Sequence, residues 1–73
     1  MQIKLGTKVD IISDRNRYRG NTGEVVEIIP IYKKDENGNF YQLKDWEVYQ
    51  IDIGQAIVDC HLGEIMPLKA QQR

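Results

Sequence analysis

Short stretches in which apolar and polar residues alternate recur along this chain, and segments with helical spacing are almost absent. Four stretches carry strand-like patterns, at residues 8–13, 24–29, 46–53 and 55–62. Alternation with a period of two is typical of strands with one buried face. Gly54 separates the last two stretches and supplies a tight turn. The pattern predicts at least four antiparallel strands and no helix longer than about two turns.

The alternation also predicts which side chains form the core. Four residues are expected to be mostly buried: Val9, Ile11, Val58 and Leu62. Cys60 lies on the same face of its strand as Val58, so it is expected to be a small buried apolar residue.

The strand predicted at residues 24–29 has two alternative inward faces. Two pairs of residues can point inward, depending on where the strand kinks: Val26 with Ile28, or Val25 with Ile29. The spacing Gly-x-Val-x-x-Ile from Gly23 onward places apolar residues as a strand with one irregularity does. Pro30 removes a ladder donor, so the strand lies at an edge or bends there.

Residues 5–28 resemble the KOW motif, in which two short strands flank a basic loop punctuated by glycines. The resemblance implies a five-stranded barrel of the Src-homology-3 type. Residues 30–45 exceed a minimal barrel of this kind, and Asn37-Gly38 is a strong hairpin signal, so we expect an extended β-hairpin between the second and third strands. Residues 61–68 look like the helical turn and short last strand that close such barrels. We expect one domain over 1–73, with its core at 6–68 and a polar tail at 69–73.

Length and composition limit the classes of function. With 73 residues, 41% of them hydrophobic and 29% charged, the chain forms a single small domain with little room for a deep catalytic cleft. No apolar run approaches the length of a membrane span, and the first residues do not resemble a signal peptide. The single cysteine agrees with a reducing compartment. We therefore expect a cytoplasmic protein that does not contact membranes.

The charge distribution is uneven. The net charge is −1, without the basic excess typical of proteins that bind nucleic acid mainly through phosphates. Residues 1–34 carry seven basic and four acidic groups, a net of +3, whereas residues 35–73 carry three basic and seven acidic groups, a net of −4. If the fold separates these halves, one face attracts anions and the other repels them.

The basic loop, together with the KOW resemblance, predicts contact with RNA or with a ribonucleoprotein or transcription assembly. Arginine suits phosphate binding and an aromatic ring stacks on an unpaired base, so these residues form the candidate nucleic-acid interface: Arg15, Arg17, Tyr18 and Arg19, with Lys33 and Lys34 as further phosphate contacts. The structural alternative is a solvated loop whose arginines pair with Asp10, Asp14 or Glu24.

An aromatic group on the predicted hairpin indicates a second class of function. Its members are Tyr32, Phe40 and Tyr41, joined by Trp46 at the start of the next predicted strand. Clustered aromatics are typical of interface hot spots, so the chain is alternatively an accessory subunit that docks on a larger protein complex. The structural explanation is that the hairpin aromatics stabilise the ribbon as cross-strand pairs and that Trp46 is partly core.

No set of residues predicts catalysis. Cys60 and His61 are adjacent and point to opposite faces of a strand, so they neither share a metal nor act together. Asp52 and Asp59 flank a predicted hairpin, where paired carboxylates usually aid solubility. We expect a non-enzymatic binding module with no metal, cofactor or small-molecule substrate.

Overall fold

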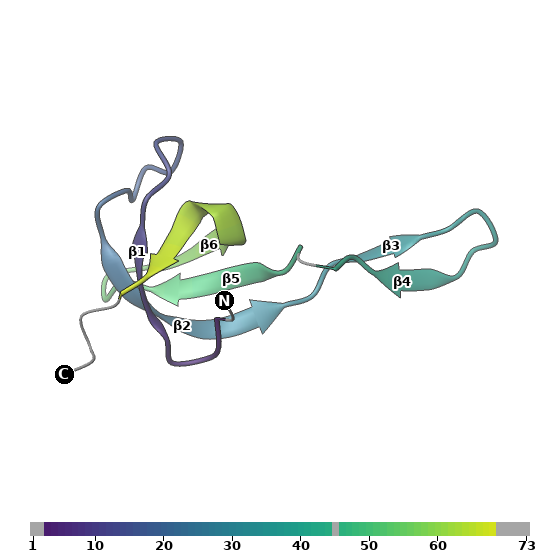
Figure 1. The fold of residues 1–73 in the computed structure, drawn as a ribbon, viewed down its shortest axis with the longest axis horizontal. Coiled ribbons are helices and arrows are strands. Elements are labelled where there is room, and N and C mark those ends of the chain that lie inside the picture. Colours follow the sequence, from purple (N-terminus) through teal and green to yellow (C-terminus); the bar gives the residue numbers. More distant parts are fainter. Residues whose placement is uncertain (1–2, 45, 69–73) are drawn as a thin grey trace.

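A computed structural model describes residues 3–44 and 46–68 (Figure 1). Its elements, in chain order, are β1 (Lys8–Ile11), β2 (Thr22–Ile29), β3 (Tyr32–Lys34), β4 (Phe40–Gln42), β5 (Val48–Asp52), β6 (Ile57–His61), the 3₁₀ turn η1 (Leu62–Glu64) and β7 (Ile65–Pro67). All strand pairings are antiparallel, and the described residues contain no α-helix. The predicted all-β class is confirmed. The expected tail at 69–73 and position 45 of the expected hairpin segment lie outside the described residues.

The strands form two sheets. The larger has the order β6-β5-β2-β1-β7, and β3 pairs only with β4 in a separate ribbon (Figure 1). The ribbon lies between β2 and β5 in sequence, where the extended hairpin was expected. Over the described residues the large sheet has two free edges, at β6 and β7, and no pairing joins them into a closed barrel.

The core lies on one face of the large sheet. Its most deeply buried side chains come from four strands: Val9, Ile11, Val25, Ile51 and Cys60. Val58 is also buried, so the prediction holds for Val9, Ile11, Val58 and Cys60. Leu62 is 40% exposed and its predicted burial is wrong. The alternation stops at His61, where β6 ends, and Leu62 begins η1 instead of continuing the strand.

A β-bulge in β2 resolves the two alternatives left by the sequence. Val25 pairs with Ile51, but Glu27 pairs with Gln50, so one extra residue is inserted between them. Val25 and Ile28 therefore both face the core, a combination that neither unbroken register allows. The irregular spacing from Gly23 to Ile28 predicted this break.

Gly23 lies where β2 passes very close to β5. A Cβ atom at this position would be 2.5 Å from the carbonyl oxygen of Asp52 and 2.6 Å from Cγ2 of Ile51. No side chain fits at these distances, so Gly23 is required by the close approach of the two strands.

One helical turn and a short last strand follow β6, as the sequence predicted. The backbone N–H of His61 donates to Oε1 of Glu64 at 2.8 Å, and β7 then pairs with β1. Ile3, which precedes the expected core boundary at residue 6, is also buried. Among the described residues, no helix has the length and apolar character needed to cross a membrane.

Candidate functional site

The basic loop connects β1 to β2 and is built from consecutive turns. Its backbone N–H groups donate to carbonyl oxygens three residues earlier, from Asn16 to Ser13, from Arg19 to Asn16 and from Asn21 to Tyr18. The N–H of Gly20 donates to the carbonyl oxygen of Ile11 at 2.9 Å, so the end of the loop is bonded to the end of β1. These bonds give the loop a defined conformation.

Asn16 fastens this loop to the core. Its Oδ1 accepts from the N–H of Tyr18 at 2.8 Å, and its Nδ2 donates to Sγ of Cys60 at 3.6 Å. Sequence reasoning did not single out Asn16. The available signal was an asparagine between two arginines in a turn-forming stretch, since asparagine side chains often bond to backbone groups two residues away.

The loop arginines take different environments. Arg19 Nε lies 3.1 Å from Oδ1 of Asp14, and both side chains are well exposed. The Arg17 guanidinium lies 5.4 Å from the centre of the Tyr18 ring, which is itself half-buried and packed on the core. The alternative of arginine–carboxylate pairing thus holds for Arg19, while Arg15 is exposed.

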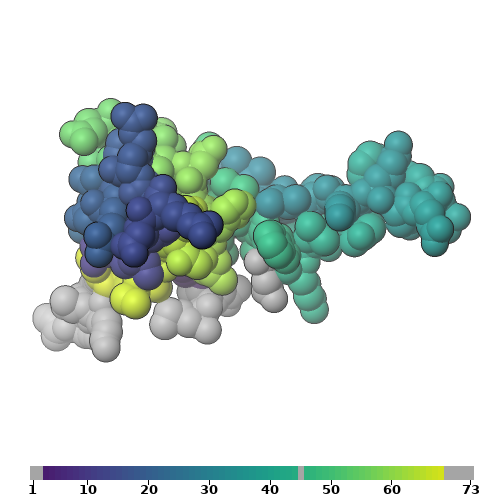
Figure 2. All heavy atoms as spheres, turned by 90° about the horizontal axis from the view of Figure 1, so that it is seen from above, coloured from purple at the N-terminus to yellow at the C-terminus, as the bar shows by residue number. Residues whose placement is uncertain are grey.

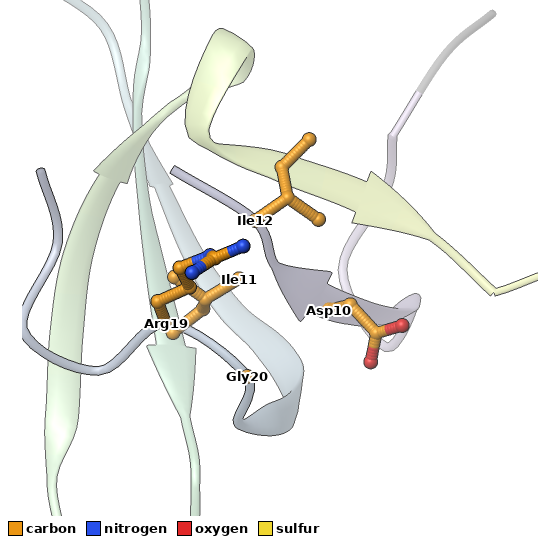
Figure 3. A pocket seen from close by; sticks show the side chains of 5 residues that line it. All are labelled: Asp10, Ile11, Ile12, Arg19 and Gly20. Carbon is orange, nitrogen blue, oxygen red and sulfur yellow. The ribbon is translucent and has the colours of Figure 1, made fainter. Parts of the chain in front are cut away.

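An open hollow of about 470 Å³ lies beside the loop (Figure 3). Its lining residues are Asp10, Ile11, Ile12, Arg19 and Gly20. Asp10 Oδ1 accepts a hydrogen bond from Oγ1 of Thr22 at 2.6 Å, so this carboxylate is engaged by β2 and not by an arginine. The hollow combines one guanidinium, one carboxylate and an apolar wall.

The ribbon protrudes from the body of the molecule (Figure 2). All six residues of β3 and β4 are exposed. At its tip the N–H of Asp35 donates to the carbonyl of Asn39 at 2.8 Å, which encloses residues 36–38, and Gly38 has a φ of +86°. Oδ1 of Asp35 accepts from the N–H groups of Asn37 and Asn39, both at 2.9 Å. The tip is therefore well ordered by its own hydrogen bonds.

The ribbon aromatics do not pair with one another across the strands. The cross-strand partners are Tyr32 with Gln42, Lys33 with Tyr41, and Lys34 with Phe40. Because alternate residues share a face, Tyr32 and Phe40 lie on one face and Tyr41 on the other. The expected aromatic cross-strand pairs are absent from β3 and β4, and Lys34 instead places its Nζ 5.6 Å from the centre of the Phe40 ring.

The six candidate nucleic-acid residues divide between two places. Arg15, Arg17, Tyr18 and Arg19 share the loop, whereas Lys33 and Lys34 lie on opposite faces of the ribbon, away from the loop (Figure 1). The fold thus brings the loop residues together and leaves the lysines apart from them.

Trp46 is 59% exposed, so the expectation that it is partly core is wrong. It lies just before β5 and lines a shallow hollow of about 230 Å³ together with Glu47, His61, Leu62 and Gly63. None of the residues that line this hollow belongs to β3 or β4. Exposure of both Trp46 and Leu62 leaves an apolar surface beside η1.

The residues considered for catalysis lie on opposite faces of a strand or bond to different partners. Cys60 is buried and His61 exposed, on opposite faces of β6. Burial, followed by the nearby charge of Glu64, raises the pKa of the Cys60 thiol to about 11, so the unreactive thiol form persists at neutral pH. Oδ1 of Asp52 accepts from the N–H of Gly54, whereas Oδ1 of Asp59 accepts from Nε2 of Gln50. Within residues 3–44 and 46–68, no three potential metal ligands gather.

No protein-family model, curated protein or solved structure matches the chain.

Proposed function

We propose that this chain is a non-enzymatic binding module that docks on a larger protein assembly through its ribbon. The observation that carries the proposal is the exposure of the three ribbon aromatics, which is 57% for Tyr32, 69% for Phe40 and 47% for Tyr41. Large aromatic side chains in such positions are typical anchors of protein interfaces, where they bury much area at low entropic cost.

The construction of the ribbon supports the same function. Within the described part of the chain its two strands pair only with each other, and an isolated two-stranded ribbon is marginally stable in water. None of its aromatics lies directly opposite another, so directly facing aromatic pairs do not account for their presence; Tyr32 and Phe40 share a face only as diagonal neighbours. A partner surface that buries Phe40 and Tyr32 on one face supplies the missing contacts.

The body of the module fits a partly open barrel of the Src-homology-3 type, as the KOW resemblance implies. Without the ribbon, five strands remain, and the last of them, β7, returns to pair with the first, β1. The turn η1 bridges β6 and β7 where a closed barrel would need them to meet. We place the module in the cytoplasm, in keeping with its single cysteine, which is free and buried.

Interaction mapping with ribbon variants tests the docking function. A variant with Tyr32→Ser, Phe40→Ser and Tyr41→Ser is compared with a control, Leu5→Ser, which removes an exposed apolar side chain elsewhere. Partners cross-linked to the native chain are identified, purified and titrated against each variant. We expect the ribbon variant to lose at least about tenfold in affinity and the Leu5 variant to bind normally. Equal binding by both variants refutes docking through the ribbon.

Single-face variants locate the contact. Tyr32→Ser with Phe40→Ser changes one face, and Tyr41→Ser changes the other. Because the first face carries two aromatics, we expect its loss to weaken binding more.

A second candidate function is RNA binding by the basic loop. It is favoured by the convergence of Arg15, Arg17 and Arg19 on one ordered loop beside an open hollow. Titration of labelled single-stranded oligouridine at low salt tests it. Replacement of the three arginines by alanine should abolish binding, and each lost phosphate contact should reduce the salt slope by about 0.7. No binding at low salt removes this candidate without affecting the docking proposal.

A further inference from the structure

The two free edges of the large sheet differ in their hydrogen-bonding capacity. On β7, the backbone N–H and C=O groups of Met66 point toward β1, where Met66 lies opposite Asp10. The N–H of Ile65 donates to the carbonyl of Leu62, and Pro67 has no N–H. The edge of β7 therefore offers no backbone donor along the strand, which is one way in which proteins protect an edge from further pairing.

Among the described residues, no strand pairs with the outer edge of β6. The N–H of Ile53 donates to the carbonyl of Ala56 at 3.0 Å, so these residues form a hydrogen-bonded pair at the end of the β5–β6 hairpin. Hydrogen-bonded and non-bonded pairs alternate in antiparallel ladders, so bonding continues at Val58 and Cys60. The N–H and C=O groups of Ile57 and Asp59 consequently point away from β5.

The open stretch has a defined length. At His61 the outward N–H is already occupied by Glu64, so the free donors of β6 are those of Ile57 and Asp59. Both residues are exposed, with Ile57 at 58%. Two donors and two acceptors in alternate positions match one edge of a short extended peptide.

The side chains beside this edge are acidic. In the register of β2, β5 and β6, the outward face carries the row Glu24, Asp52 and Ile57, followed by the row Glu27, Gln50 and Asp59. Lys8 of β1 lies opposite Glu24 and offsets the charge farthest from the β6 edge. A strand added to β6 would place some of its residues directly opposite Ile57 and Asp59. The side chains of those residues would lie on the same face of the sheet as the four carboxylates.

We propose that the β6 edge binds an extended, basic segment of a partner protein by strand addition, with lysine or arginine side chains over the acidic outer face. The partner strand runs antiparallel to β6. The backbone of Ile57 and Asp59 supplies the affinity, and Asp52 and Asp59 select basic side chains. This surface is separate from the ribbon, so the inference does not depend on ribbon docking.

The charges decide between the possible occupants. A second copy paired through β6 would join two acidic faces in one continuous sheet, and the like charges would repel. The ribbon also has free strand edges, but Lys33 and Lys34 flank them and disfavour a basic peptide. Of the β6 edge and the ribbon edges, only the β6 edge has a charge complementary to a basic strand from another protein.

The test uses a seven-residue peptide of alternating lysine and valine. We expect it to bind and to slow exchange of the Ile57 and Asp59 amide protons by at least about tenfold, while the Tyr32 and Lys34 amides stay unchanged. In an antiparallel arrangement the lysine amides face β6, because bonded residues lie directly opposite one another. N-methylation of the lysine amides should abolish binding, whereas N-methylation of the valine amides should leave it intact.

Variants of the protein test the charge selection. Asp52→Asn with Asp59→Asn keeps both side-chain acceptors and should weaken binding by about tenfold. The control Asp14→Asn with Glu36→Gln removes the same charge elsewhere and should have little effect. A glutamate–valine peptide should not bind. The proposal is overturned if the lysine peptide does not bind, if both methylated peptides bind equally, or if sedimentation shows that the free protein pairs with itself through β6.

Discussion

Asn16 and Cys60 are 44 residues apart in the chain, and the asparagine Nδ2 donates to the cysteine Sγ at 3.6 Å. This contact joins the middle of the basic loop to the core of the large sheet. The same side chain accepts from the N–H of Tyr18, so Asn16 is bonded both to the core and to the backbone of its own loop.

Replacement of Asn16 should therefore loosen the loop. We expect Asn16→Ala to reduce the free energy of unfolding by about 1–2 kcal/mol, because it leaves the N–H of Tyr18 without its partner. Exchange of the Tyr18 amide proton should accelerate. Asn16→Asp retains the acceptor for Tyr18 and should restore the slow exchange. Urea titration and hydrogen exchange measure both effects, and unchanged Tyr18 exchange in the alanine variant would contradict this role.

The raised pKa of Cys60 predicts a pH-dependent stability. Burial raises the thiol pKa from 9.0 to about 11, so the folded state holds this proton more tightly than the unfolded state does. The stabilisation is complete below pH 9 and is lost as the pH rises toward 11. Cys60→Ala should remove this part of the pH dependence, which a comparison of unfolding free energies across pH 8–11 will measure. Identical slopes for both proteins would contradict it.

The same burial predicts slow chemistry at the thiol. Labelling of Cys60 by a thiol reagent at pH 7 should require unfolding or local opening. Cys60→Ser should destabilise the protein by about 1 kcal/mol. Labelling at the rate of a free thiol in the folded protein would show that the core assignment is wrong.

Two glycines offer a matched test of strand packing. Gly23→Ala forces a Cβ atom against the backbone of Asp52, and we expect a loss of about 2–4 kcal/mol in unfolding free energy. At Gly63 nothing lies within 4 Å of the added Cβ, so Gly63→Ala should cost less than about 1 kcal/mol. Chemical denaturation compares the two variants. Equal effects would contradict the close approach of β2 and β5.

The ribbon should be energetically separate from the body. Its aromatics are exposed and outside the core, so combined serine substitutions at Tyr32, Phe40 and Tyr41 should change global stability by less than about 1 kcal/mol. Ile51→Ala, in the centre of the core, should cost about 2–5 kcal/mol. A large loss of global stability in the ribbon variant would show that the aromatics are structural.

Asp14 should limit the attraction of the basic loop for anions. Its carboxylate pairs with Arg19 and cancels part of the local positive charge. If the loop binds RNA, Asp14→Asn should increase affinity for oligouridine at low salt by a few-fold, with a smaller gain at high salt. Global stability should barely change, because exposed ion pairs contribute little. Weaker RNA binding by this variant would contradict a repulsive role for Asp14.

The strands and the direction of most of their side chains are predictable from local sequence patterns. Alternation identified Val9, Ile11, Val58 and Cys60 as core, and the interrupted spacing after Gly23 indicated the bulge in β2. Turn residues located the ribbon tip at Gly38, and the resemblance to small barrels indicated the final turn. These features are local, because period-two burial and turn geometry depend on neighbouring residues.

Contacts between residues distant in the chain depend on how the strands pair. The register of β3 with β4 set lysines, not aromatics, opposite Phe40 and Tyr41, and the end of β6 exposed Leu62. Pairing across three strands assembled the acidic outer face and left the donors of Ile57 and Asp59 free. The bond from Asn16 to Cys60 likewise spans most of the chain. Local patterns do not encode such relationships, because a shift of one residue in strand register reverses every face.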